Sequence, residues 1–381
     1  MVADDVLKLV KMRNEAARDL GFSNHYEMSL NLNEQNHEEI YKLFDELDEL
    51  TREKFTELKD EIDDYLSVRF FINKDELMIW HYQDKFFQLG PAIFNVEYDK
   101  YFKDVNIEES CRNYYDGIDL NIDDIISASD LYERENKYQH AYCTEIDREG
   151  DIRIVCNIKP SHRWMNIMLH ESGHAAYDKY VDRALPWSLR KHSHIITTES
   201  IAMMFGRLAS TPAWLVDVVY VKTDEAERIK EDSIKSLMLE QLTFSRWVQV
   251  MYRFERSMYE DPDQDLNKLW WDLVEKYQMI KKPEGRDKPD WASKIHIALY
   301  PAYYHNYMLG ELMASQLYYH IVTKVLGNEY NNNESFASQK KVGAFLKEEF
   351  FSHGTKLHWN DLINSATGEY LTPKYYAKQF I

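Results

Sequence analysis

Residues 161–180 read SHRWMNIMLHESGHAAYDKY, and this stretch determines how the rest of the chain is interpreted. It contains two histidines four positions apart, His170 and His174, with Glu171 directly after the first. Residues four apart lie on one face of an α-helix, so both imidazoles can reach a single zinc ion. Glu171 then lies close enough to act as a general base toward a water molecule. The stretch therefore predicts a helix that carries a zinc site.

The residues around this motif favour a buried helix. Apolar side chains precede it at Trp164, Ile167, Met168 and Leu169, and two alanines and a tyrosine follow it at 175–177. Burial of two histidines and a glutamate without a partner costs free energy, which a bound metal ion would offset. The alternative is that the histidines only pack in the core or face solvent and bind no metal.

A catalytic zinc site takes a third protein ligand and leaves its fourth position to water. The strongest candidate is Glu199, an acid in the otherwise apolar stretch HIITTESIAMMFGRL. An isolated buried acid usually binds something, because its charge is costly to bury unpaired. The alternative is that Glu199 only belongs to a helix start capped by Thr197 or Thr198. Weaker rivals lie in a polar run further along the chain: Glu225, Glu227 and Glu231.

The composition describes a folded protein with an acidic surface. Of the 381 residues 44% are hydrophobic, which is enough for a large core, and the net charge is −19. That charge repels phosphate backbones, so no nucleic-acid partner is expected. No run approaches the roughly 18 apolar residues of a membrane span, so no membrane association is expected either. The three cysteines are too few and scattered for a disulfide framework, which indicates the cytoplasm.

The N-terminal part predicts two amphipathic helices. Apolar residues recur at helical spacing over 4–20, and Gly21 follows where a helix would close. Asn36 can cap a second, longer helix whose apolar stripe covers 40–66. Both helices should pack one face against the core and leave the other in solvent.

The middle of the chain predicts a small sheet. Ile152, Ile154, Cys156 and Ile158 alternate with polar residues after a turn at 147–150, which is typical of a β-hairpin. From about residue 161 the helical pattern returns. We therefore expect one mainly α domain over 1–381, with a helical part at 1–128 and the zinc-site part at 129–381.

These residues resemble the angiotensin-converting enzyme family, which are gluzincin zinc peptidases that release C-terminal dipeptides. The likeness covers the chain from about residue 129 to its end, and more weakly the N-terminal KMRNEAARDLGF. The motifs that carry it occur in the family's order: HAYCTEIDREGDIRIVC (140–156), HESGHAAY (170–177), RLASTP (207–212), LWWDLVEKYQ (269–278), SKIHI (293–297) and YHNYMLGELMASQL (304–317).

The resemblance implies a zincin-like, two-lobed helical fold with a deep central cleft and the small sheet beside the active site. It implies zinc on His170, His174 and Glu199, with Glu171 as the base. It places Tyr307 and His296 at the scissile carbonyl, where a phenol and an imidazole can stabilise the developing oxyanion.

The resemblance also implies how a short peptide substrate is held. His140 and the backbone at Ala141 would bind it as an added strand. Tyr304 and Lys294 would bind its C-terminal carboxylate. Without the resemblance, Tyr304 and Tyr307 would be interpreted as aromatic residues that pack between helices, and Lys294 as a lysine on the surface.

The chain departs from the family pattern at several positions. One extra residue stands between His296 and Tyr304, so Tyr303 competes for the role given to Tyr304. Asn306 replaces an arginine that binds chloride, so chloride activation is not expected. Met203 replaces an aspartate that orients a zinc histidine, and Asp178 is a possible substitute.

Further departures concern a disulfide and the N-terminal lid. Gln139 replaces the cysteine that would pair with Cys156, which agrees with a reducing compartment. The family's N-terminal lid segment has no counterpart, so the chain is either naturally short or lacks its natural start. The prediction of a cytoplasmic location depends on which of the two holds.

We expect a zinc peptidase that releases C-terminal dipeptides from short peptides. One alternative is an oligoendopeptidase of the thimet oligopeptidase and oligoendopeptidase F type, which shares the zinc helix and cuts internal bonds. Another is a protein that binds zinc or peptide without hydrolysis. The sequence gives neither the peptide preference nor the oligomeric state.

Overall fold

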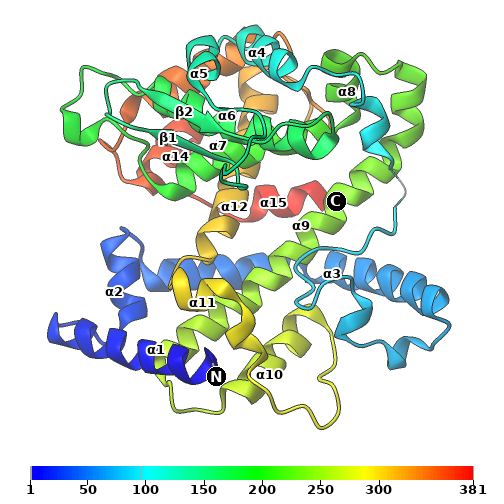
Figure 1. Ribbon diagram of the computed structural model, residues 1–381, viewed down its shortest axis with the longest axis vertical. Helices are drawn as coiled ribbons and strands as arrows, with labels where there is room; N and C mark the ends of the chain where they lie inside the picture. Colours follow the sequence, from blue (N-terminus) through cyan, green and yellow to red (C-terminus); the bar gives the residue numbers. More distant parts are fainter. Residues whose placement is uncertain (1, 95, 381) are drawn as a thin grey trace. The chain divides into compact units, whose positions relative to one another are not determined.

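The computed structural model describes residues 2–94 and 96–380, which form a mainly helical structure (Figure 1). The chain divides into two compact units. Unit 1 comprises Met1–Ile93, Met238–Met308 and Phe380–Ile381, and unit 2 comprises Phe94–Leu237 and Leu309–Gln379. In the described ranges, no helix combines the length and the apolar character needed to cross a membrane. The predicted mainly α fold with a small sheet is confirmed, whereas the boundary expected at 128/129 stays a prediction.

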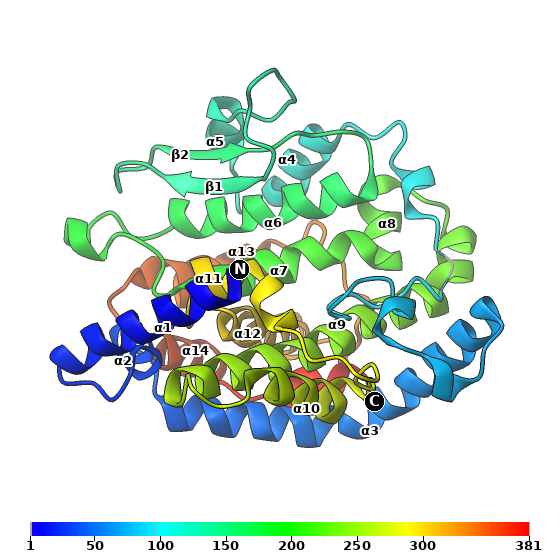
Figure 2. The ribbon, with the colours of Figure 1, turned by 60° about the horizontal axis from the view of Figure 1, so that its bottom comes forward.

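Unit 2 is built around two adjacent helices and a hairpin. The helices are α6 (His162–Lys179) and α7 (Ile195–Gly206), and the hairpin lies along α6 (Figure 2). Ser161 starts α6, because its hydroxyl accepts the N–H of Trp164. His194 starts α7 in the same way, because its Nδ1 accepts the N–H of Ile196. Both helices of the predicted site therefore have defined first turns.

The predicted hairpin is confirmed, with shorter strands than expected. Strand β1 (Tyr142–Glu145) pairs antiparallel with β2 (Ile152–Val155), and Tyr142 lies opposite Val155. Cys156 and Ile158 follow the ladder rather than extend it, because their N–H groups donate to Asp130 and Leu131 instead. In the described part of the chain, the other edge of β1 has no strand paired to it.

Shorter helices complete unit 2. They are α4 (Ile107–Gly117), α5 (Asp123–Ala128), α8 (Pro212–Val219), α13 (Lys340–Phe345), α14 (Trp359–Thr367) and α15 (Lys374–Ala377). The long helices α9 (Thr223–Glu260) and α12 (His305–His320) contribute residues to both units. Contact between α4 and α6 is close: the Tyr115 hydroxyl on α4 donates to the carbonyl of Leu169.

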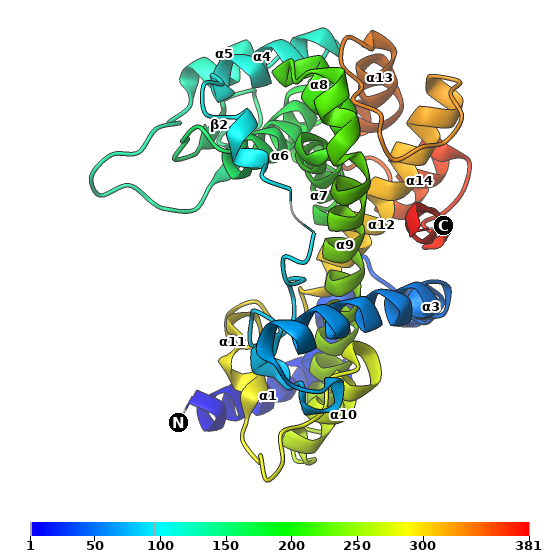
Figure 3. The same ribbon diagram turned by 90° about the vertical axis from the view of Figure 1, so that its right-hand side faces the viewer.

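Unit 1 consists of helices, which gather in one group in Figure 3. It contains α1 (Val2–Asp19), α2 (His25–Leu32), α3 (His37–Phe70), α10 (Leu266–Gln278) and α11 (Ile295–Leu299), with the second part of α9. Both predicted N-terminal helices are confirmed. Gly21 adopts φ +90° just after α1, and the Asn36 side chain accepts the N–H groups of Glu38 and Glu39 at the start of α3.

A glycine allows α6 and α7 to lie in close contact. A Cβ at Gly173 would lie 3.0 Å from the Cα of Ala202 on α7 and 3.3 Å from the carbonyl oxygen of Ile201. Backbone atoms move aside less easily than a side chain does, so a larger residue here would push the two helices apart by a few tenths of an ångström. Gly173 is one of the two residues between Glu171 and His174, so the motif itself determines the distance between the two helices.

Gly173→Ala should therefore destabilise the protein, by about 1–3 kcal/mol of the free energy of unfolding, because overpacking outweighs the better helix propensity of alanine. Urea unfolding of the purified protein measures this difference. Gly117→Ala in α4 is the matched control, because its Cβ would meet Ser338 no closer than 3.5 Å. Equal stability of the two variants would contradict the prediction.

Candidate metal centre and substrate-binding residues

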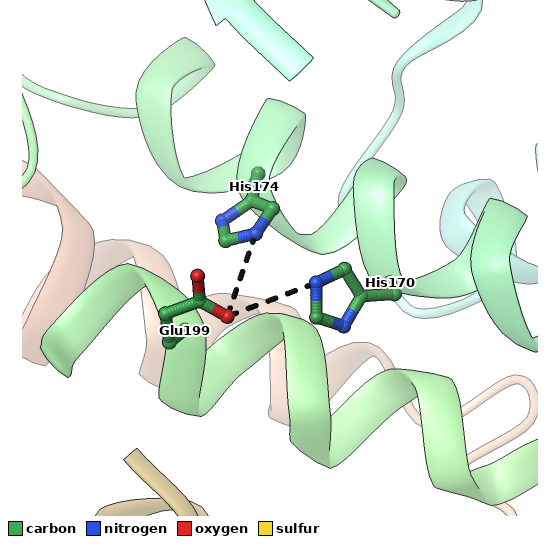
Figure 4. A group of neighbouring side chains, drawn as sticks. All are labelled: His170, His174 and Glu199. Carbon is green, nitrogen blue, oxygen red and sulfur yellow. Dashed lines mark ion pairs between the residues drawn. The ribbon is translucent and has the colours of Figure 1, made fainter. Parts of the chain in front are cut away.

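Three side chains of unit 2 converge on one point (Figure 4). His170 and His174 come from α6, and Glu199 comes from α7. The Glu199 Oε2 atom lies 3.8 Å from Nε2 of His170 and 4.0 Å from Nε2 of His174. One donor atom from each residue lies within 4.8 Å of the other two. Among the described residues this is a complete set of three metal donors.

The donor set fits zinc in its chemistry and in its approximate size. Two imidazole nitrogens and one carboxylate oxygen are a known catalytic zinc set. In a tetrahedral site with bonds of about 2.0–2.2 Å, donor atoms lie roughly 3.3–3.5 Å apart, so the two distances from Glu199 to the histidines exceed this separation by roughly half an ångström. The His170 side chain is 29% exposed, so the site is accessible from solvent.

Burial favours the uncharged form of each donor. It lowers the pKa of His170 to about 4 and lowers that of His174 well below its usual value. Neutral imidazole is the form that binds metal. Burial also raises the pKa of Glu199 to about 7, against the opposing effect of the nearby His192. A dication at this point would supply the charge partner that the carboxylate lacks.

Thr198 is a site residue that the sequence analysis did not identify. Its hydroxyl lies 2.6 Å from Nδ1 of His174, so it orients the ring with Nε2 toward Glu199. The sequence indicates Thr198 only as a helix cap. Its position directly before Glu199, on the helix that faces His174, is the one sequence feature that could have indicated a role at the metal site. Asp178, the suggested partner of a zinc histidine, instead lies 3.0 Å from Nδ1 of His192.

Glu171 lies between α6 and the hairpin. It is 8% exposed, and its carboxylate accepts a hydrogen bond from the backbone of Cys143 on β1. Burial, reinforced by the neighbouring Glu199, raises the pKa of Glu171 to about 7. A carboxylate with a pKa near neutrality can both take up and release a proton in the pH range of ordinary enzyme reactions.

The predicted peptide-binding segment lies at the start of the hairpin. Ala141 immediately precedes β1, and His140 is exposed one residue earlier, outside the strand, with its ring 5.5 Å from that of Tyr138. The outer edge of β1 has no strand paired to it in the described residues, and one of its backbone groups, that of Cys143, donates to Glu171.

The remaining predicted residues form a separate cluster in unit 1. The ring of His296 contacts that of Tyr304 edge to face at 4.8 Å, and Tyr304 contacts Tyr307 at 5.3 Å. The Tyr304 hydroxyl accepts the indole N–H of Trp247 at 2.8 Å. Tyr303, the competitor, contacts Tyr307 instead. Tyr304 is thus the tyrosine that lies against both His296 and Lys294.

His296 is uncharged at neutral pH. Burial, with a smaller contribution from Lys294, lowers its pKa to about 4. Its Nδ1 atom is buried, and no hydrogen-bond partner for it is found among the described residues. A neutral imidazole can donate one N–H, as the role implied for His296 requires.

Lys294 is a buried cation rather than a surface lysine. It is 9% exposed, and its Nζ lies 5.2 Å from the ring centroids of Trp247 and Tyr304. Nζ donates to the Gln88 side chain at 2.7 Å, and in the described ranges no carboxylate lies within ion-pair distance. Burial accordingly lowers the pKa of Lys294. Gln88 is a second residue that the sequence analysis missed.

The weaker candidates for the third metal ligand form ion pairs away from the two histidines. Glu225 forms an ion pair with Lys100 at 3.1 Å, and Glu227 and Glu231 pair with lysines of their own helix, α9. None of the three belongs to the metal-donor group found in the described residues. Asn306, at the position of the family's arginine, accepts a hydrogen bond from Gln35 at 2.5 Å.

Comparison with known proteins agrees with this arrangement of residues. The peptidase M2 family, described as angiotensin-converting enzyme, matches residues 99–374. Carboxypeptidase 1 of Bacillus subtilis (strain 168) is 23% identical in an alignment 258 residues long, which covers 62% of this chain and 50% of that protein. The chain thus spans half the length of this curated relative. The matched family segment contains all three metal donors, and we conclude that the chain belongs to the angiotensin-converting enzyme family of metallopeptidases.

Proposed function

We propose that this protein is a zinc peptidase that hydrolyses short peptides and releases dipeptides from their C-termini. The observation that carries the proposal is the convergence of His170, His174 and Glu199 beside the carboxylate of Glu171. Three donors with a neighbouring base are the minimum that zinc-dependent hydrolysis requires. A cytoplasmic location and the absence of nucleic-acid partners stay predictions.

His170, His174 and Glu199 would hold the zinc ion. When bound, zinc supplies Lewis-acid catalysis, polarising a carbonyl and making water a stronger nucleophile. Glu171 takes the proton from the attacking water and returns it to the leaving amine, for which its raised pKa is suited. Tyr307 and His296, given these roles by the family resemblance, would donate hydrogen bonds to the oxyanion of the tetrahedral intermediate.

Two observations support cleavage near the C-terminus. Lys294 is a buried ammonium group that forms no ion pair in the described residues, and a peptide carboxylate would supply its counter-ion. The relative from Bacillus subtilis is named a carboxypeptidase.

The edge of β1 to which no strand is paired in the described residues supports the binding of an extended peptide. Substrate backbone would pair with the segment from His140 and Ala141 into β1, beside the carboxylate of Glu171. Such pairing depends on main-chain groups, which all peptides have. It would therefore hold peptides of many sequences in one register.

Glu171→Gln should lower kcat by about 10²–10⁴-fold, because glutamine cannot accept the proton of the attacking water. Zinc content should remain near one per chain, because the three donors are unchanged. Mass spectrometry of a short-peptide digest and of the metal content measures both quantities. Near-normal turnover, or loss of zinc together with activity, would contradict the role given to Glu171.

Glu199→Gln should weaken zinc affinity by about 100-fold or more, because it removes the anionic donor and leaves two neutral ones. Competition with a chromophoric chelator measures this affinity. Glu225→Gln, which changes the strongest rival acid on α9, is the matched control and should bind zinc as the unchanged protein does. Equal affinities of the two variants would refute the proposed third ligand.

Lys294→Met should raise KM about tenfold or more for peptides with a free C-terminus and leave KM for their amidated forms unchanged, because only the carboxylate is recognised. Steady-state kinetics on matched peptide pairs separates these effects. Release of dipeptides supports the proposal. Internal cuts with the same KM for both forms would instead indicate an oligoendopeptidase, and tight binding without cleavage would indicate a binding protein.

A further inference from the structure

Glu255 is a buried acid that the proposed reaction does not use. It lies on α9 within unit 1 and is 2% exposed. Its carboxyl group forms no ion pair in the described part of the chain, and the charge of Arg13 acts on it from a greater distance. Its Oε1 atom instead accepts the backbone N–H of Ala302 at 2.8 Å. A carboxyl group buried without a counter-ion is costly, so its contact with this one backbone group calls for an explanation.

Ala302 lies in the turn between α11 and α12. The Tyr300 N–H closes α11 on the carbonyl of His296, and the Asn306 N–H opens α12 on the carbonyl of Tyr303. Ala302 lies between these bonds, is nearly buried, and follows Pro301, which has no N–H to donate. Without Glu255 the N–H of Ala302 would be a buried donor without an acceptor.

The turn also has a strained backbone. Ala302 adopts φ +53°, in the left-handed region that residues with a Cβ rarely occupy. Such a conformation persists only where the surrounding structure enforces it. The hydrogen bond to Glu255 is made by this residue itself, so it is the contact best placed to enforce the turn.

A second side chain fixes the other end of the same segment. Arg13 on α1 donates to the carbonyl of Ala298, in the last turn of α11, at 2.8 Å, and to the Tyr259 hydroxyl at 3.1 Å. Side chains from α1 and α9 therefore hold the connection from α11 to α12 at two points. His296 lies before this connection, and Tyr304 and Tyr307 lie after it.

We infer that Glu255 is a positioning residue for catalysis, which fixes the α11–α12 turn through the N–H of Ala302 and thereby sets His296 relative to Tyr304 and Tyr307. The inference rests on the proposed roles of His296 and Tyr307. Positions of transition-state donors must be held within a fraction of an ångström, so a support that is far from the substrate can still limit the rate.

The contact that Glu255 makes with the turn is that of a hydrogen-bond acceptor. Burial raises the pKa of its carboxyl group to about 8, against the opposing effects of the bond from Ala302 and the charge of Arg13. Glutamine reproduces the shape and the acceptor oxygen, and leucine reproduces only the approximate volume. A comparison of the two substitutions therefore isolates the bond to Ala302.

Glu255→Gln should keep kcat within about threefold of the unchanged enzyme. Glu255→Leu should lower kcat at least about tenfold. Its change in KM should be smaller, because oxyanion donors act mainly in the transition state. Zinc content should be unchanged in both variants, because the metal donors belong to unit 2. Hydrogen exchange measured by mass spectrometry should show faster exchange over 299–304 in Glu255→Leu only.

Asp63→Asn is the matched control, because Asp63 is a partly buried acid of the same unit that pairs with Lys59 and Tyr82, away from the turn. It should leave kcat unchanged. Wild-type kcat in Glu255→Leu, or an equal loss in Glu255→Gln and Glu255→Leu, would overturn the inference. If Glu255→Leu does not fold, Glu255→Asp replaces it, since the shorter acid withdraws the acceptor, and wild-type kcat in that variant overturns the inference.

The test separates this inference from the proposed function. Glu171→Gln and Tyr307→Phe are assayed in the same series. Loss of activity in both, with an unaffected Glu255→Leu, leaves the peptidase mechanism intact and removes only the role of Glu255. Unaffected turnover in Tyr307→Phe removes the oxyanion donor on which the inference rests, and the inference fails with it.

Discussion

Close contact between α6 and α7 is the constraint on which the candidate metal centre depends. Two donors come from one helix and the third from the other, so their separation is set by how closely the helices approach. Gly173 permits that approach, and the facing Thr198 uses it to orient His174. The five-residue motif therefore specifies helix packing as well as ligand identity. A bulkier residue at its fourth position would move Glu199 away from the histidines.

The sequence predicted those features that depend on local pattern. The long helix capped by Asn36, the hairpin around 147–150 and the convergence of Glu199 with the two histidines are all present. Each follows from spacing, capping or the isolation of an acid among apolar residues. The mainly α fold was predictable for the same reason.

Features that depend on contacts distant in sequence were not predictable. Gln88 and Lys294 are separated by more than two hundred residues, and no local pattern links them. Lys294 reads as a surface residue because a polar loop precedes it, yet three aromatic rings from different segments surround its ammonium group. Asp178 follows His174 by one helical turn, which suggests it as the hydrogen-bond partner of that histidine. In the fold, His192 is the histidine that lies against Asp178 instead.

The edge of β1 to which no strand is paired in the described residues has a consequence for the proposed choice of substrate. Exposed strand edges invite aggregation, and this one is limited to four residues with a partly exposed face, which is too short to nucleate a stable intermolecular sheet. A polypeptide that pairs with it must present unsatisfied main-chain groups in an extended form. Folded proteins have already paired those groups internally, so they are poor partners. If peptides bind there as proposed, the strand edge would select unstructured chains independently of their side chains.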